Sequence, residues 1–156
     1  MPQEIERKFL LKNNDWKSLV SRSYSIQQGY LNSDPERTVR VRIKDDRGIL
    51  TIKGKNEGIT RSEYEYEIPI KEAEELIQLC ELSIIKKVRN IVTLNSHIWE
   101  IDVFDGANKG LVLAEVELES EDTEILLPDW IGKEVSHDIR YYNSNLAKNP
   151  INPLRS

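Results

Sequence analysis

The N-terminal stretch EIERKFLL alternates charged and apolar residues in a way that suggests chemistry. Glu4, Glu6 and Lys8 occupy every second position, and Ile5 and Phe9 lie between or beside them. If the stretch forms a β-strand, the three charged side chains point to one face, because successive side chains of a strand point to opposite faces. Two carboxylates and one ammonium group on the same face of a strand need a chemical explanation.

Basic and acidic side chains are segregated in the same alternating way along the chain. The basic strand faces carry Arg40, Arg42 and Lys44, then Lys53 and Lys55, then Lys87 and Arg89, and the acidic faces carry Glu63 and Glu65, then Glu100 and Asp102, then Glu115 and Glu117. For any single strand, a water-exposed face is the simpler explanation. A solvated sheet usually mixes the two signs, however, because like charges on neighbouring strands repel. Segregated faces therefore favour a ligand that supplies the missing charge.

The expected repulsion within the basic face indicates what this ligand is. A hairpin turn centred on Asp46 and Arg47 would place Arg40 opposite Lys53. Two like charges about 5 Å apart repel by roughly 3 kcal/mol at an effective dielectric constant near 20. A polyphosphate would relieve this repulsion, because arginine and lysine side chains bind phosphate oxygens.

The acidic face cannot bind phosphate directly, but it can do so through a divalent cation. Mg²⁺ is typically held by one or two carboxylates together with phosphate oxygens and water. Zn²⁺ is disfavoured, since one cysteine and two separated histidines provide no ligand set for it. The sequence therefore predicts a metal–polyphosphate site built inside a sheet.

Alternation with a period of two residues dominates the chain and predicts a mainly β (α+β) protein. The predicted strands are residues 3–12, 24–32, 37–45, 49–56, 60–69, 84–94, 97–105 and 111–119, and the predicted helices are residues 71–79 and 143–148. Eight mostly antiparallel strands suggest a barrel or a strongly curved sheet. A two-residue turn at Asn95 and Ser96 would place Asp102 opposite Arg89, so that the carboxylate holds the guanidinium group in position.

Length and composition limit the remaining possibilities. A chain of 156 residues predicts a single domain over residues 1–156. The formal net charge of −5 gives no global basic field, so we expect no nucleic-acid partner. No apolar run approaches 18 residues, so we expect no membrane span. The single cysteine, Cys80, excludes an intramolecular disulfide and fits a reducing compartment. We expect a cytoplasmic monomer or homodimer.

Eight motifs in order resemble the CYTH superfamily, the triphosphate tunnel metalloenzymes. They are Glu4, Glu6 and Lys8 (ExExK), Gln28 to Leu31 (QGYL), Arg40 and Arg42 (RxR), Thr51 and Lys53 (TxK), Glu63 and Glu65 (the acidic fifth strand), Lys87 and Arg89 (KxR), Glu100 and Asp102 (ExD), and Glu115 and Glu117 (ExE). The tail GKEVSHDIRYYNSNLA is similar to the closing family pattern GxEVTxDxRYxNxxLA. The resemblance covers residues 3 to 148 and is strongest to the small bacterial inorganic triphosphatases.

This resemblance implies an eight-stranded antiparallel closed barrel, with a charged lumen that binds triphosphate and a few peripheral helices. The apolar strand faces, including Val41, Ile101 and Trp99, would pack outside the barrel wall. In this hypothesis the metal ligands, for Mg²⁺ or Mn²⁺, are Glu4, Glu6, Glu115 and Glu117. The substrate-binding residues are Lys8, Arg40, Arg42, Lys53, Lys87 and Arg89, with Lys55 as a weaker contact at the rim. The residues with catalytic or orienting roles are Lys87, Glu63, Glu65, Glu100, Asp102 and Tyr30.

The leading functional hypothesis is a metal-dependent hydrolase that cleaves a terminal phosphate from inorganic triphosphate. The chain is short, and no element is left over to recognise an adenine or a thiamine. The alternatives are a class IV-type adenylate cyclase, which expels pyrophosphate from ATP, and then a thiamine triphosphatase. The contrasting class is a non-catalytic module that binds polyphosphate or nucleotides. Loss of a metal carboxylate would mark such a module, and none of the motif carboxylates is missing.

Overall fold

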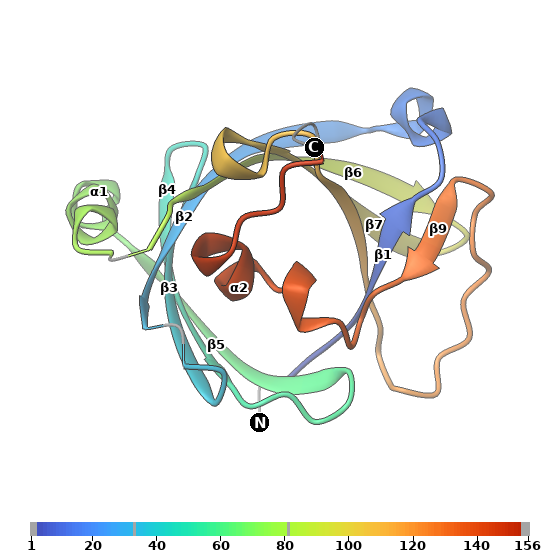
Figure 1. Ribbon diagram of the computed structural model, residues 1–156. Coiled ribbons are helices and arrows are strands. Elements are labelled where there is room, and N and C mark those ends of the chain that lie inside the picture. The colour runs from blue at the N-terminus through green and yellow to red at the C-terminus, as the bar shows by residue number, and fades with distance from the viewer. Residues whose placement is uncertain (1–2, 33, 81, 154–156) are drawn as a thin grey trace.

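The computed structural model describes residues 3–32, 34–80 and 82–153, in which antiparallel strands curve into a closed ring (Figure 1). The strands are β1 (Gln3–Leu11), β2 (Arg22–Asn32), β3 (Arg37–Lys44), β4 (Arg47–Gly54), β5 (Thr60–Ile68), β6 (Ile85–Leu94), β7 (His97–Asp105), β8 (Val112–Glu117) and β9 (Ile131–Glu134), and the α-helices are α1 (Ile70–Gln78) and α2 (Asn143–Lys148). Short 3-10 helices span Asp15–Leu19, Gly106–Asn108 and Ile139–Tyr141. The strand order is β5-β4-β3-β2-β6-β7-β8-β1-β9, and β5 also pairs with β1, which closes the barrel. The predicted eight-stranded barrel is confirmed.

Strand β9 adds to the predicted set. The first residues of β1 pair with β5, whereas Phe9 and Leu11 pair with β9. The short strand β9 therefore continues the barrel wall along β1 past Thr60, the first residue of β5. A Cβ atom at Gly132 would lie 3.1 Å from the carbonyl oxygen of Leu10, so the glycine permits this close approach. With only the four residues IGKE, β9 is too short for an alternating pattern to reveal it.

Aromatic side chains on the outer faces of the strands form one core of the protein. The ring centroids of Phe9 and Trp99 lie 5.7 Å apart, and those of Trp99 and Trp130 lie 5.6 Å apart. Only 1% of Trp99 is exposed, and it packs in the same cluster as Ile101 and Val116. The prediction that Trp99 and Ile101 pack outside the barrel wall is confirmed.

Replacing Trp99 with alanine should lower the free energy of unfolding by about 3–5 kcal/mol, the usual cost of truncating a buried aromatic ring. The turnover number of the folded protein should change little, because the ring lies on the face opposite the charged side chains. Chemical denaturation and a turnover assay on the same preparation measure both quantities. Loss of turnover at unchanged stability would contradict this placement of Trp99.

Helix α1 covers the outer faces of β3 and β4. Its buried residues Ala73 and Ile77 pack against Val41. A Cβ atom at Gly48 would lie 2.7 Å from the Cβ of Ala73, so the helix rests directly on the strand backbone. The helix predicted for residues 71–79 is confirmed with this apolar face.

Helix α2 lies inside the ring of strands (Figure 1). The prediction of peripheral helices is therefore wrong for α2, and the predicted charged lumen also has an apolar part. Leu146 of α2 is fully buried in a cluster that includes Tyr30, Ile85, Phe104 and Leu113. The strands contribute these residues from the same face as the charged ones, so the lumen has an apolar end and a charged end. Within the described ranges, neither α1 nor α2 is long and apolar enough to cross a membrane.

The β6–β7 hairpin has the predicted register, with Arg89 opposite Asp102. The β3–β4 hairpin does not, because its turn is centred one residue earlier than predicted, at Asp45 and Asp46. Arg40 therefore lies opposite Thr51, and its predicted pairing with Lys53 is wrong. The positive φ of Asp45, 53°, belongs to the tight turn that sets this register.

Candidate active site

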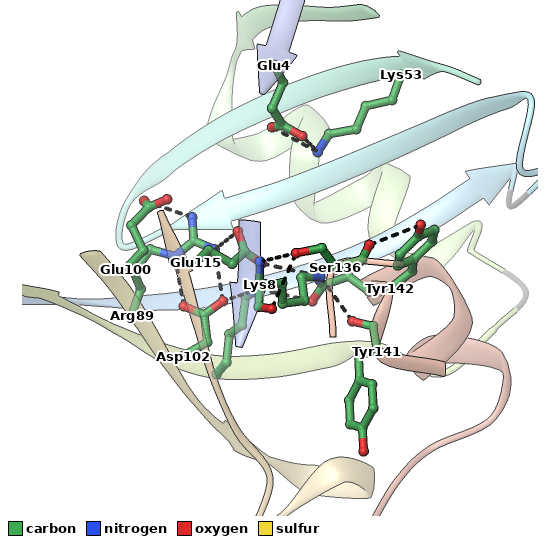
Figure 2. A network of polar contacts seen from close by, with 12 residues as sticks. Glu4, Lys8, Lys53, Arg89, Glu100, Asp102, Glu115, Ser136, Tyr141 and Tyr142 are labelled. Carbon is green, nitrogen blue, oxygen red and sulfur yellow. Dashed lines mark hydrogen bonds and ion pairs between the residues drawn. The ribbon is translucent and has the colours of Figure 1, made fainter. Parts of the chain in front are cut away.

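Charged side chains from most of the strands meet in a cavity of about 240 Å³ inside the barrel. The predicted site residues that line it are Arg40, Arg42, Lys53 and Arg89, together with Glu4, Glu6, Glu63, Glu65, Glu100, Glu115 and Glu117. Lys8, Lys87 and Asp102 join the same network of contacts, part of which Figure 2 shows. The structure thus brings together nearly all the residues that alternation placed on the charged faces.

Two buried arginines of β3 lack the close carboxylate partners that buried cations usually have, as far as the described residues go. Arg40 donates from Nη2 to Thr51 Oγ1 at 3.2 Å; among the described residues its nearest carboxylate oxygen is 3.9 Å away on Glu65 and its buried Nε has no hydrogen-bond partner. Arg42 donates from Nε to Gln28 Oε1 at 2.7 Å. Burial, reinforced by Arg40 and Arg89, lowers the pKa of Arg42 to about 9. These guanidinium groups are therefore poised for an anion.

The opposite wall of the cavity holds an excess of carboxylates. Burial, together with the nearby Glu115 and Glu4, raises the pKa of Glu6 well above its ordinary value. Burial and a hydrogen bond with Glu4 raise the pKa of Glu63 to about 8. Burial and neighbouring glutamates also raise the pKa of Glu117. Two other carboxylates have lowered pKa values instead, because lysines neutralise them.

Lys53 and Lys8 are the lysines that neutralise Glu4 and Glu115. Lys53 Nζ lies 2.9 Å from Glu4 Oε1, and Lys8 Nζ lies 3.4 Å from Glu115 Oε1 (Figure 2). Burial alone would raise the pKa of both glutamates, but Lys53 lowers that of Glu4 and Lys8 lowers that of Glu115. Two ion pairs therefore join β1 to strands on either side of it, Glu4 to Lys53 of β4 and Lys8 to Glu115 of β8.

Asp102 is the central carboxylate of a buried cluster. Its Oδ2 lies 2.7 Å from Lys87 Nζ, and its Oδ1 accepts a hydrogen bond from Arg89 Nε at 2.8 Å. Burial would raise the pKa of Asp102, but Arg89 and Lys87 lower it to about 2. For Lys87, burial outweighs Asp102 and, with help from Arg89 and Arg42, lowers the pKa to about 7. Asp102 thus orients two basic groups, of which the hairpin register predicts Arg89.

Asp102→Asn should destabilise the protein by about 3–5 kcal/mol, because it leaves Lys87 and Arg89 buried beside a neutral group. Chemical denaturation measures the change. The matched control is Asp138→Asn, which breaks the exposed pair between Asp138 and Arg140 and should alter stability little. Equal effects of the two substitutions would contradict the structural role assigned to Asp102.

The segment that ends in α2 reaches two of the predicted substrate-binding lysines. Lys8 Nζ donates to the carbonyl oxygen of Tyr141 at 3.0 Å, and Lys87 Nζ donates to Asn143 Oδ1 at 3.0 Å. The side chain of Ser136 accepts a hydrogen bond from the backbone N–H of Lys8 at 3.0 Å. The C-terminal segment therefore forms the floor of the charged part of the lumen.

The donor chemistry of the acidic wall fits a divalent metal. Across the described residues, no three His, Cys, Asp or Glu side chains stand close enough together to hold an ion in this arrangement. Glu4, Glu6, Glu115 and Glu117 nevertheless offer carboxylate oxygens, the ligands that Mg²⁺ and Mn²⁺ prefer. Burial, and then neighbouring glutamates, raise the pKa of Glu6 and of Glu117, and a bound cation would favour the ionised form of both.

Some predicted residues lie at the margin of the site. The side chain of Lys55 is 69% exposed and pairs with Glu36 at 3.9 Å, so the structure does not bring it into the charged cavity. Glu65 lies at the edge of the cavity with 47% of its side chain exposed. Glu117 is also exposed, at the open mouth of the barrel. Tyr30 faces the lumen, but it belongs to the apolar cluster around α2.

The structure adds Lys44, Gln28 and Thr51 to the predicted set. Lys44 lines the charged cavity, Gln28 accepts the hydrogen bond from Arg42, and Thr51 accepts one from Arg40. In the sequence, Lys44 could be found because it shares a strand face with Arg42. Gln28 and Thr51 could be found because they belong to the QGYL and TxK motifs. Their polar roles depend on cross-strand register, which the sequence pattern alone leaves open.

Comparison with known proteins was consistent across family, sequence and structure. Residues 2–148 match the CYTH domain model. An inorganic triphosphatase of Acetivibrio thermocellus is 48% identical over 151 residues, which cover 96% of each chain. An inorganic triphosphatase of Nitrosomonas europaea is 35% identical over 148 residues, which cover 92% of this chain and 96% of the relative. A crystal structure of an inorganic triphosphatase superposes with a TM-score of 0.67 at 33% identity, covering 94% of this chain and 95% of the other.

The match to the family model spans nearly the whole chain and includes every motif that supplies the charged cavity. The matched region also covers 96% of the length of each of the two relatives. The closed barrel of the structure, with its charged lumen, is the architecture that the sequence resemblance implied. The chain therefore belongs to the CYTH domain family.

Proposed function

We propose that this protein is a divalent-metal-dependent hydrolase that cleaves a terminal phosphate from inorganic triphosphate bound in the barrel lumen. The observation that carries the proposal is the pair of buried cations on β3, Arg40 and Arg42, for which the described part of the chain provides no close carboxylate partner. They face a wall of carboxylates whose raised pKa values favour a cation. A metal-bound triphosphate supplies both missing charges at once.

The basic side chains hold the substrate in position. Arg40 and Arg42 bind non-bridging phosphate oxygens through their free N–H groups, and Arg89, oriented by Asp102, binds others. Lys87, whose pKa is about 7, donates a proton to the leaving phosphate oxygen as the terminal P–O bond breaks. Water adds to the terminal phosphorus and loses a proton to solvent, from which Lys87 is reprotonated, so that pyrophosphate and phosphate are the products. Positioning and charge neutralisation then supply most of the rate.

Glu4, Glu6, Glu115 and Glu117 would hold the metal, for which we propose Mg²⁺ or Mn²⁺. When bound, the ion would neutralise charge on the phosphate oxygens and lower the pKa of a coordinated water. Lys53 and Lys8, which neutralise Glu4 and Glu115 in this structure, would be released to bind phosphate oxygens. The remaining carboxylates, Glu63, Glu65 and Glu100, would orient basic side chains or the attacking water.

The alternatives have less support. The relatives that match most of this chain at 48% and 35% identity are inorganic triphosphatases, which disfavours the adenylate cyclase and thiamine triphosphatase hypotheses. A non-catalytic binding module is disfavoured because the four metal-ligand candidates all face the lumen or its mouth. We also place the protein in the cytoplasm, which its single cysteine supports.

One assay with three substrates tests the proposed activity. Phosphate release and cyclic AMP formation are measured with tripolyphosphate, ATP and thiamine triphosphate, each with Mg²⁺ or Mn²⁺ and with a chelator. We expect metal-dependent release of phosphate, fastest from tripolyphosphate, and no cyclic AMP. Cyclic AMP as the main product from ATP, or faster cleavage of thiamine triphosphate, would overturn the proposal.

A further inference from the structure

The two ends of the lumen differ in the space that they offer to a ligand. At the α2 end, the apolar cluster around Leu146 closes the barrel, the cavity beside Asn143 has a volume of about 60 Å³, and a groove of about 290 Å³ adjoins it beside Tyr142 and Lys148. At the other end, a cavity of about 950 Å³ opens between β1, β2, β8 and the β6–β7 turn. Pockets for drug-sized ligands need roughly 300–1,000 Å³. The open mouth therefore offers the largest of these spaces to an organic group on a triphosphate.

Lys44 is fixed at the edge of this mouth by the β3–β4 turn. The backbone N–H of Asp45 donates to the carbonyl oxygen of Ser25 at 2.9 Å, and Asp45 Oδ1 accepts a hydrogen bond from the backbone N–H of Ser25 at 3.0 Å. These two bonds tie the tip of the hairpin to β2. They place the ammonium group of Lys44 4.1 Å from the ring centroid of Tyr24. Lys44 lines both the charged cavity and the open mouth.

Lys44 differs from the other lysines of the lumen in having no carboxylate partner among the described residues. Lys8, Lys53 and Lys87 each pair with a carboxylate, at 3.4 Å, 2.9 Å and 2.7 Å respectively. Within the described part of the chain, no carboxylate oxygen lies within 4.0 Å of the Lys44 ammonium group. With Arg40 and Arg42, it completes a row of three cations along β3, at every second residue from the interior to the mouth. A linear polyanion that enters by the mouth would meet this row.

We propose that Lys44 binds the mouth-side end phosphate of inorganic triphosphate and thereby selects it against nucleoside triphosphates. The inference rests on the proposed function and adds the residue that sets its substrate specificity. An inorganic triphosphate has a free phosphate at each end, and such a group has a second pKa near 6, so it is largely doubly charged near neutral pH. In a nucleoside triphosphate, the phosphate at the mouth is esterified, carries one charge and bears a neutral ribose.

The mouth favours the free phosphate for a second reason. Tyr24 is the aromatic residue that lines it, and its ring already contacts Lys44 at 4.1 Å and the guanidinium carbon of Arg22 at 5.1 Å. A purine would have to displace one of these cations in order to stack on the ring. The volume of the mouth would admit a nucleoside, so charge rather than size provides the discrimination.

Steady-state kinetics of Lys44→Ala tests the inference. Tripolyphosphate hydrolysis gives kcat/KM for the inorganic substrate, and inhibition of that reaction by ATP gives the inhibition constant of the nucleotide, both with Mg²⁺. We expect kcat/KM to fall at least tenfold and the inhibition constant of ATP to change less than twofold. Lys44→Arg, which keeps the charge, should restore most of kcat/KM. Lys86→Ala, which removes an exposed lysine from the outer face of β6, should match the parent protein.

An unchanged kcat/KM in Lys44→Ala, or equal weakening of tripolyphosphate and ATP, would overturn the inference. Equal weakening would mean that Lys44 contributes only to the general positive potential. A parent protein that does not hydrolyse tripolyphosphate would instead refute the proposed function. Circular dichroism of each variant verifies folding, which the partly exposed position of Lys44 favours.

Discussion

Replacing Arg42 with alanine will lower tripolyphosphate turnover by two or more orders of magnitude while leaving the barrel folded. Arg42 is 8% exposed, and its hydrogen bond to Gln28 leaves its other N–H groups for the ligand. Removing one fork from a desolvated anion site costs roughly 2–5 kcal/mol of interaction. Arg40→Ala should have a similar effect, because Arg40 is similarly buried and its Nε has no hydrogen-bond partner within residues 3–32, 34–80 and 82–153. The measurement is kcat and kcat/KM of the purified variants.

Arg7 provides the matched control for these two variants. It lies on the opposite face of β1 from Glu6 and Lys8, outside the barrel, where its Nη2 donates to Glu134 Oε1 at 2.7 Å and its guanidinium carbon lies 5.1 Å from the Phe9 ring centroid. Losing such a surface ion pair should cost about 1 kcal/mol or less. Arg7→Ala should therefore retain most of the turnover. An inactive Arg7→Ala together with an active Arg42→Ala would refute the assignment of faces, and with it the lumen as the site.

Glu6→Gln will abolish metal-dependent hydrolysis and, without ligand, will make the protein more stable. In the folded state burial and the nearby Glu115 and Glu4 raise the pKa of Glu6 well above 4.5, so its ionised form is disfavoured there relative to the unfolded chain. This penalty appears as pH rises above the unfolded pKa and grows until the folded pKa is reached. A neutral amide avoids it. The stability gained by the variant should therefore increase from pH 5 to pH 8.

Thermal unfolding across this pH range gives a readout that is independent of activity. Glu134→Gln is the control, because Glu134 pairs with Arg7 on the outside of the barrel and should not affect the metal requirement. An active Glu6→Gln protein with unchanged metal dependence would refute the metal assignment. A variant that loses activity but is less stable at every pH would refute the electrostatic explanation.

The alternation of charge made the barrel lumen predictable from the sequence. The side chains that share parity with Arg42 do face the cavity, and the two-residue turn at Asn95 and Ser96 fixes the contact between Arg89 and Asp102. These features depend on strand geometry, which has a strict period of two residues. The sequence carries them because each of the strands β1 to β8 is long enough to show several repeats.

Other features depended on geometry that the sequence pattern does not contain. Tyr30 shares the lumen face with Gln28, yet it packs on α2, because that helix fills one end of the barrel. A six-residue helix has too few turns to reveal which surface it covers. The single-residue error in the β3–β4 turn came from the left-handed conformation of Asp45, which placed Arg40 opposite Thr51. Lys55 lies outside the lumen, contrary to its predicted place at the rim, because β4 ends at Gly54.

The central claim is that triphosphate and metal bind together inside the barrel, between the cations of β3 and the carboxylates of β1 and β8. The most direct test is a crystal structure with Mn²⁺ and imidotriphosphate, a hydrolysis-resistant analogue, in which anomalous scattering locates the metal. We expect an anomalous peak in contact with carboxylates from Glu4, Glu6, Glu115 or Glu117, and phosphate oxygens within hydrogen-bond distance of Arg40 and Arg42. A metal or a triphosphate bound only outside the barrel, for example beside Lys55, would contradict the account.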